Sequence, residues 1–190
     1  MKVTYNTLRI LLVLCIGAGC SSQQQSSLSG RRPNILICMA DDASYPYMGA
    51  YGSRWIKTPA FDSVAREGIL FMNAYTPNAK CGPSRACILT GRNSWQLEAA
   101  ANHWAFFPEK FRTFIETLTD NGYHTGYTLK GWAPGKIAGD KPRFLTGKPY
   151  NDKKITPPTT GIATMDYAGN FESFLSERPA DTPFCRGIKV

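Results

Sequence analysis

An almost unbroken apolar run from Asn34 to Ala40 is the first strong hydrophobic pattern after the amino-terminal segment. Strands of parallel sheets are covered on both faces, so the run predicts a strand buried in a parallel sheet. It ends at two adjacent carboxylates, Asp41 and Asp42. Because open α/β sheets bind ligands beyond the carboxyl ends of their strands, the pair is a candidate site for calcium or magnesium. A solvated pair in a loop is the alternative.

Alternating helix and strand patterns continue along the chain. Apolar residues at helical spacing predict helices over 58–68, 108–121 and 166–177. Extended runs predict strands over 69–72 and 123–130, and the start of another at 181–185. This order indicates an α/β fold with a mixed, mostly parallel sheet flanked by helices. The segment 136–161, rich in Lys, Pro, Gly and Thr, predicts a long surface excursion.

The two ends of the chain differ from this pattern. Residues 1–20 carry basic residues, a short apolar run and then Gly-Ala-Gly-Cys, which predicts an export signal rather than a membrane-spanning helix. Gly-Ala-Gly-Cys resembles a bacterial lipobox, which implies lipidation of Cys20; ordinary signal cleavage is the alternative. Residues 21–31 form a Ser/Gln-rich tether. Residues 186–190 are interpreted as an aberrant or truncated end, because the last predicted strand does not continue.

The composition limits the classes of partner. The chain is 43% hydrophobic, as in globular domains, and its net charge of +8 is spread without a compact Lys/Arg run. This pattern argues against nucleic-acid binding and is compatible with an anionic substrate. The cysteines beyond the signal and tether show no disulfide or zinc spacing; they are Cys38, Cys81, Cys87 and Cys185. Cys38 and Cys87 are interpreted as buried apolar residues.

The densest chemistry lies between Cys81 and Arg92, in the sequence CGPSRACILTGR. Pro83 suits the first turn of a helix and Gly91 suits its end. Cys81 then lies at the helix N-terminus, where unpaired N–H groups favour an anion, with Arg85 one turn further along. Taken alone, the pattern indicates either a reactive thiol or a small buried cysteine beside a turn.

The wider pattern, Cys-x-Pro-Ser-Arg followed by Leu-Thr-Gly-Arg, resembles the signature of type I sulfatases in the alkaline phosphatase-like superfamily. In that family a formylglycine-generating or sulfatase-maturating enzyme oxidises the cysteine to formylglycine. Pro33 to Asp42 also resembles the family's opening segment, in which both Asp residues ligate calcium. The resemblance implies an alkaline phosphatase-like fold, formylglycine at Cys81, and one calcium ion bound by Asp41, Asp42 and the modified Cys81.

Two further site residues follow from the resemblance. Lys130, in Lys-Gly-Trp, matches the family lysine that binds sulfate, and with Arg85 it would stabilise charge on that anion. Trp132 stands where the family has a histidine that protonates the leaving group, so the general acid is unassigned. His103 lies in an aromatic segment and is a candidate catalytic and sulfate-binding residue, with simple packing as the alternative.

The resemblance is closest to bacterial sulfamidase-like and glycosaminoglycan sulfatases. It implies hydrolysis of sulfate esters or sulfamates on a sulfated carbohydrate. The export signal and the lipobox-like sequence predict a protein of the bacterial periplasm, or an outer-membrane or cell-surface lipoprotein held by its lipid anchor. The resemblance covers 32–185, the amino-terminal part of a longer catalytic domain, so we expect a marginally stable chain with weak or no activity. The alternatives are a phosphodiester or phosphonate hydrolase of the same superfamily and a non-catalytic envelope lipoprotein fragment.

Overall fold

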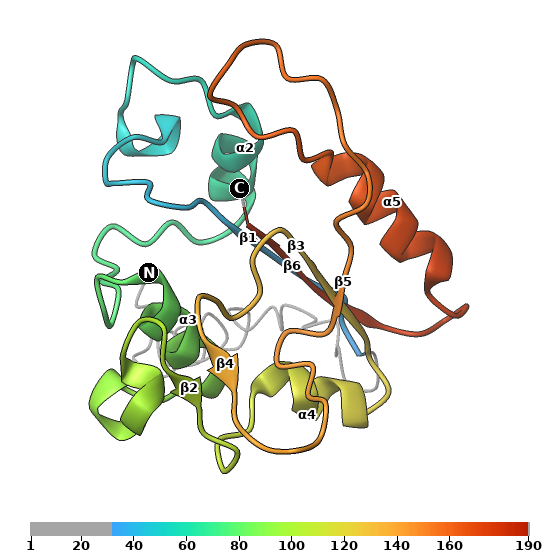
Figure 1. The fold of residues 1–190 in the computed structure, drawn as a ribbon. Helices are drawn as coiled ribbons and strands as arrows, with labels where there is room; N and C mark the ends of the chain where they lie inside the picture. The colour runs from blue at the N-terminus through green and yellow to red at the C-terminus, as the bar shows by residue number, and fades with distance from the viewer. Residues whose placement is uncertain (1–31, 190) are drawn as a thin grey trace, which may run out of the picture. The chain divides into compact units, whose positions relative to one another are not determined.

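A parallel sheet forms the centre of the fold. The computed structural model describes residues 32–189, and every helix and strand lies in one compact unit, Pro33–Val190. The sheet order is β1-β6-β3-β5 with all neighbours parallel (Figure 1). Its strands are β1 (Ile35–Met39), β3 (His124–Thr128), β5 (Lys148–Pro149) and β6 (Phe184–Lys189). A separate parallel pair joins β2 (Phe106–Phe107) to β4 (Lys136–Ile137).

Helices cover the two faces of this sheet. The helices are α2 (Pro59–Glu67), α3 (Cys81–Thr90), α4 (Phe114–Asp120) and α5 (Tyr167–Glu177), with short 3-10 turns at Gly49–Tyr51, Ser94–Gln96 and Glu98–Ala101. Of these, α3, α4 and α5 pack on the sheet, whereas α2 packs on the 3-10 turn at Gly49–Tyr51. Figure 1 shows α4 and α5 on opposite sides of the sheet. Neighbouring residues of β6 point to opposite layers, as strand geometry requires. Cys185 lies in the core with α3 and α4, whereas Arg186 lies against the aromatic rings of α5.

The hydrophobic core lies between the sheet and the α3–α4 layer. α3 contributes Ala86, Cys87 and Leu89, and α4 contributes Ile115. Phe107 is fully buried in the same cluster. This arrangement confirms the predicted α/β class with a mostly parallel sheet flanked by helices, and it confirms that Cys87 is buried. No helix among residues 32–189 combines the length and apolarity needed to cross a membrane.

The burial predicted for β1 is wrong on one face. Leu36 is 48% exposed and Cys38 is exposed, whereas Ile35 and Ile37 pack against the core. The physical reason is position, because β1 is an edge strand of the described sheet and α5 lies over β3 and β6. A run without polar residues shows that a strand tolerates burial but does not show which faces are covered.

Two other predicted strands also need correction. Residues 69–72 are irregular, with Leu70 half-buried and the other three exposed (Ile69 at 81%), because no strand among residues 32–189 pairs with them. The strand predicted to stop at 185 continues to Lys189 as β6, between β1 and β3. Backbone pairing on both sides therefore makes 186–189 part of the sheet, although the residues themselves were interpreted as an aberrant end.

Two segments differ in part from their predictions. The helix predicted over 108–121 begins at Phe114, because Thr113 and Glu116 form a capping box that fixes its start. The segment 136–161 is partly a surface excursion, as predicted, but it also supplies the buried side chains of Leu145 and Tyr150. β5 lies in this segment and pairs with β3. The first difference arises from a local capping contact, and the second arises from contacts between residues distant in sequence.

A partly buried ion pair ties α4 to the chain that follows it. Arg143 Nη2 lies 2.8 Å from Glu116 Oε2, and Arg143 Nε donates to Glu116 Oε1 at 2.9 Å. The Thr113 backbone N–H also donates to Glu116 Oε2 at 2.9 Å. Burial raises the pKa of the Glu116 carboxyl, but the hydrogen bonds from Arg143 and Thr113 outweigh it, so this pKa lies below its ordinary value.

We expect Glu116→Gln to lower the free energy of unfolding by about 1–2 kcal/mol at pH 7. A depressed folded-state pKa contributes stability that is fully present above the unfolded-state pKa and is lost as the pH falls through the folded-state pKa. The difference between the two proteins should therefore shrink in acid. Urea unfolding at pH 7 and pH 3 measures it, with Glu172→Gln on the exposed side of α5 as the control. A difference that stays constant with pH would contradict the assignment.

Candidate active site

Helix α3 carries the predicted nucleophile and the predicted cation on one side. Cys81 is the first residue of the helix, and Arg85 follows four residues later, so their side chains project from the same face. Gly91 ends the helix in the left-handed conformation, with φ of 65°, and its N–H donates to the Cys87 carbonyl at 2.8 Å. Cys81 is half-buried and Arg85 is buried.

His103 meets Cys81 at the start of this helix. His103 Nε2 lies 3.0 Å from Cys81 Sγ, within hydrogen-bonding distance. Gly82 permits this approach, because a Cβ at that position would lie 3.0 Å from His103 Cδ2. The structure thus brings His103 to the predicted nucleophile, where the sequence had suggested either a site residue or a packing residue.

Arg85, on the same helix as Cys81, carries hydrogen-bond donors that have no partner. Its Nη1 donates to the Gly131 carbonyl at 2.7 Å, which fixes the guanidinium. Its Nε and Nη2 are buried and have no partner in the structure. Burying an unpaired charged donor is costly, so this geometry favours an anion that accepts hydrogen bonds from both nitrogens. The Gly131 carbonyl was not predicted as a site group, although it directly follows Lys130 in the sequence.

Lys130 and Asp41 meet at the carboxyl edge of the sheet. Asp41 follows β1 and Lys130 follows β3, and both strands flank β6. Lys130 Nζ lies 2.7 Å from Asp41 Oδ2. The hydrogen bond to Asp41 raises the pKa of the Lys130 ammonium, and it outweighs the opposing effects of burial and of the Arg85 charge. Asp42 is exposed and adopts φ of 54°, a left-handed conformation that is strained for most residues.

The donor chemistry of Asp41 and Asp42 fits calcium, since both supply hard carboxylate oxygens. Calcium takes six to eight oxygen ligands. Within residues 32–189, no cluster of three or more His, Cys, Asp or Glu side chains is placed to hold a metal ion. The two carboxylates would therefore supply part of a calcium shell rather than a complete one.

Trp132 lies in the core rather than in the site. It is buried, and its ring meets Phe107 edge-on with 5.3 Å between centroids. An indole N–H does not titrate as a general acid, so the position matching the family histidine carries no proton-transfer group here. His103 is the titratable side chain within hydrogen-bonding distance of Cys81.

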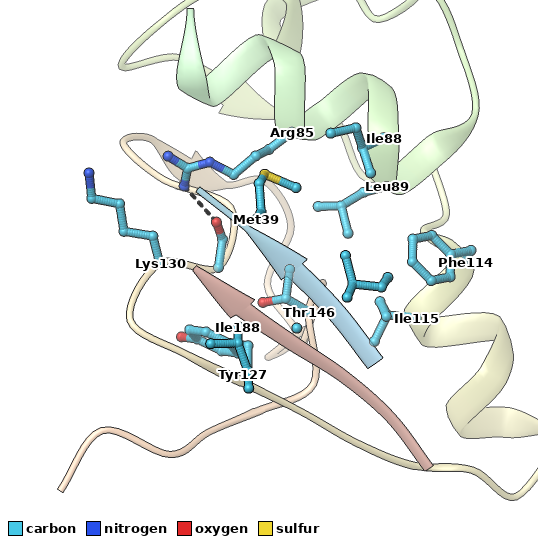
Figure 2. Close-up of a pocket in the computed structure, with 13 residues that line it drawn as sticks. Met39, Arg85, Ile88, Leu89, Phe114, Ile115, Tyr127, Lys130, Thr146 and Ile188 are labelled. Carbon is cyan, nitrogen blue, oxygen red and sulfur yellow. Dashed lines mark hydrogen bonds between the residues drawn. The ribbon is translucent and has the colours of Figure 1, made fainter. Parts of the chain in front are cut away.

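A small apolar cavity of about 70 Å³ lies beneath the two cations. Figure 2 shows Arg85 and Lys130 at one end and the apolar side chains of α3 and α4 at the other. The wall includes Ile37, Leu89 and Phe114. No local sequence pattern predicts this cavity, because its lining comes from several separate helices and strands.

Comparison with known proteins identifies the family. The family model described as Sulfatase matches residues 33–185. The chain belongs to the sulfatase family. An N-acetylglucosamine-6-O-sulfatase of Bacteroides thetaiotaomicron is 34% identical over 97% of this chain and 34% of its own length. The chain thus spans about a third of that curated relative.

Solved structures support the same assignment. A structure described as a complex with its substrate D-glucosamine-2-N,6-O-disulfate matches with a TM-score of 0.62 and 30% identity. It covers 84% of this chain and 34% of the other. The phosphonate monoester hydrolase of Agrobacterium radiobacter matches with a TM-score of 0.58 and 18% identity, over 83% of this chain and 40% of that one. The latter likeness shows a shared fold alone.

Proposed function

We propose that this chain forms the nucleophile-bearing part of a sulfatase site that hydrolyses sulfate esters or sulfamates on a sulfated carbohydrate. The observation that carries the proposal is Arg85, which is buried on the helix of Cys81 with two guanidinium nitrogens unpaired. The family assignment and the sulfated amino sugars named for the two relatives support the substrate class. Because the chain spans about a third of these proteins, we expect weak activity or none from it alone.

We further propose that Cys81 is converted to formylglycine by a maturating enzyme. The hydrated aldehyde would supply a nucleophilic hydroxyl for sulfur. It would also supply a second hydroxyl, whose deprotonation re-forms the aldehyde as the carbon–oxygen bond to sulfate breaks. Arg85 would donate to the sulfate oxygens, and Lys130 would neutralise their charge. His103 would hold the proton of the nucleophile at residue 81.

Asp41 and Asp42 would hold the calcium ion, which would lower the pKa of the attacking hydroxyl when bound. These two residues would hold the ion at the carboxyl edge of the sheet, next to α3. Export to the periplasm or cell surface, with lipidation of Cys20, remains part of the proposal. Cys20 and the tether lie outside the described residues.

Mass spectrometry of the chain co-expressed with a maturating enzyme tests the proposal. We expect the Cys81 peptide to carry the mass change of thiol to aldehyde, and Cys81→Ala to abolish both the change and any turnover. Comparing sulfate and phosphate esters of the same amino sugar separates a sulfatase from a phosphodiester or phosphonate hydrolase. An unmodified thiol despite a competent maturating enzyme would overturn the nucleophile, and would favour the non-catalytic fragment.

A further inference from the structure

Lys130 forms an ion pair with the carboxylate of Asp41, which the proposed function assigns to calcium. Its ammonium lies 2.7 Å from Asp41 Oδ2, across a sequence separation of 89 residues. The contact exists because β1 and β3 both end at this edge, with β6 between them. The structure therefore pairs a residue expected to bind sulfate with a residue expected to bind metal.

This pair is placed so that it can separate. The Lys130 side chain is 46% exposed and that of Asp41 is 23% exposed. An ion pair with this much solvent contact is weakly held, and the lysine stem is flexible enough to turn its charge elsewhere. Arg85 and Lys130 line the same cavity, so the region beside Arg85 is within the reach of a released ammonium (Figure 2).

A divalent cation and an ammonium compete for one carboxylate. A divalent cation on Asp41 would add a third positive charge beside Lys130 and Arg85, and like charges in one site repel unless further anions are present. A metal ion on Asp41 therefore weakens the contact with Lys130. An anion beside Arg85 has the opposite effect, because it offers Lys130 a new partner.

We propose that Lys130 is an internal counter-cation of Asp41, displaced toward the anion position beside Arg85 when a divalent cation binds. This inference rests on the calcium site of the proposed function. It adds a coupling to that function, because cation binding and sulfate binding then strengthen each other through the Lys130 side chain. Lys130 acts in this step as a positioning residue for the metal as well as a partner for the anion.

Calcium titration of the full chain, followed by backbone amide NMR shifts, tests the inference without an activity readout. We expect Lys130→Met to bind Ca²⁺ about tenfold more tightly than the wild type, because the competing charge is gone. Lys130→Arg should remain close to the wild type. Lys153→Met removes one exposed lysine charge from the segment leading to α5, and should also leave the affinity unchanged.

Inorganic sulfate provides the second readout. In the wild type, saturating sulfate should tighten Ca²⁺ binding by at least about fivefold, and by reciprocity Ca²⁺ should tighten sulfate binding equally. This coupling should fall in Lys130→Met. Equal calcium affinities in wild type and Lys130→Met would overturn the inference alone. Failure of every variant to bind Ca²⁺ would overturn the metal assignment of the proposed function, and this inference with it.

Discussion

Replacing Arg186 by methionine is expected to raise the free energy of unfolding by about 2 kcal/mol at pH 7, since a buried charge without a carboxylate partner is costly. Arg186 lies on β6 with no exposed surface. Its guanidinium carbon lies 4.6 Å from the Phe174 ring centroid and 4.9 Å from that of Tyr150. Its Nε and Nη1 have no hydrogen-bond partner, and within residues 32–189 it forms no ion pair.

The sign of the effect follows from two opposing contributions. Nη2 donates to Thr128 Oγ1 and to the Asn170 carbonyl, and the aromatic rings attract the cation. Burial nevertheless lowers the pKa of Arg186 to about 10, so the folded environment disfavours its charge overall. Thr128 Oγ1 also donates to the Tyr150 carbonyl at 3.0 Å, so methionine leaves this hydroxyl with a partner. Methionine also has an unbranched shape suited to the same space.

The pH dependence provides a separate check on Arg186. Between pH of about 10 and its higher ordinary pKa, the unfolded chain binds more protons than the folded chain, so wild-type stability rises with pH there. The advantage of Arg186→Met should therefore be complete below pH of about 10 and should decline above it. Urea unfolding of both proteins measures it. Arg186→Lys keeps the charge but loses the planar contacts, and it should be destabilised. A methionine variant less stable than the wild type would contradict the argument.

Helix ends that depend on nearby residues could be predicted from the sequence. Pro59 and Pro83 lie in the first turns of α2 and α3, and Gly91 ends α3, because these residues act through their own backbone geometry. The segment 69–72 has strand-forming composition, yet a strand exists only where a partner offers hydrogen bonds, and a single sequence names no partner. The position of β6 between β1 and β3 was equally unpredictable, because it depends on strand order.

The candidate site shows the same division between local and distant information. Asp41, Cys81 and Lys130 were recognised individually, because each stands in a short motif next to a predicted strand or helix. Their mutual arrangement was not predictable, since the ion pair of Lys130 with Asp41 requires two strands to end together at one sheet edge. The contact of His103 with Cys81 depends in turn on how an irregular segment folds across the start of α3.

Replacing Arg85 by methionine is expected to remove most of the anion affinity of the site. We expect inorganic sulfate to bind at least about tenfold more weakly, and any turnover of a 6-O-sulfated amino sugar to fall by about 10²–10³-fold, as for other preorganised donors. Sulfate affinity is measured from the rise in unfolding midpoint with sulfate concentration. Arg85→Lys should recover part of the affinity, because it keeps the charge but loses the planar fork.

Stability and binding should change independently in this variant, which separates a binding role from a structural one. The substitution by methionine removes two buried guanidinium nitrogens that have no partner, and the new side chain adjoins a cavity lined by apolar side chains. Arg85→Met should therefore fold at least as stably as the wild type in the absence of sulfate. Arg66→Met, on the exposed face of α2, controls for the loss of one positive charge and should keep its sulfate response. If Arg85→Met keeps the full sulfate response, the anion binds elsewhere, and the unpaired nitrogens of Arg85 do not mark its site.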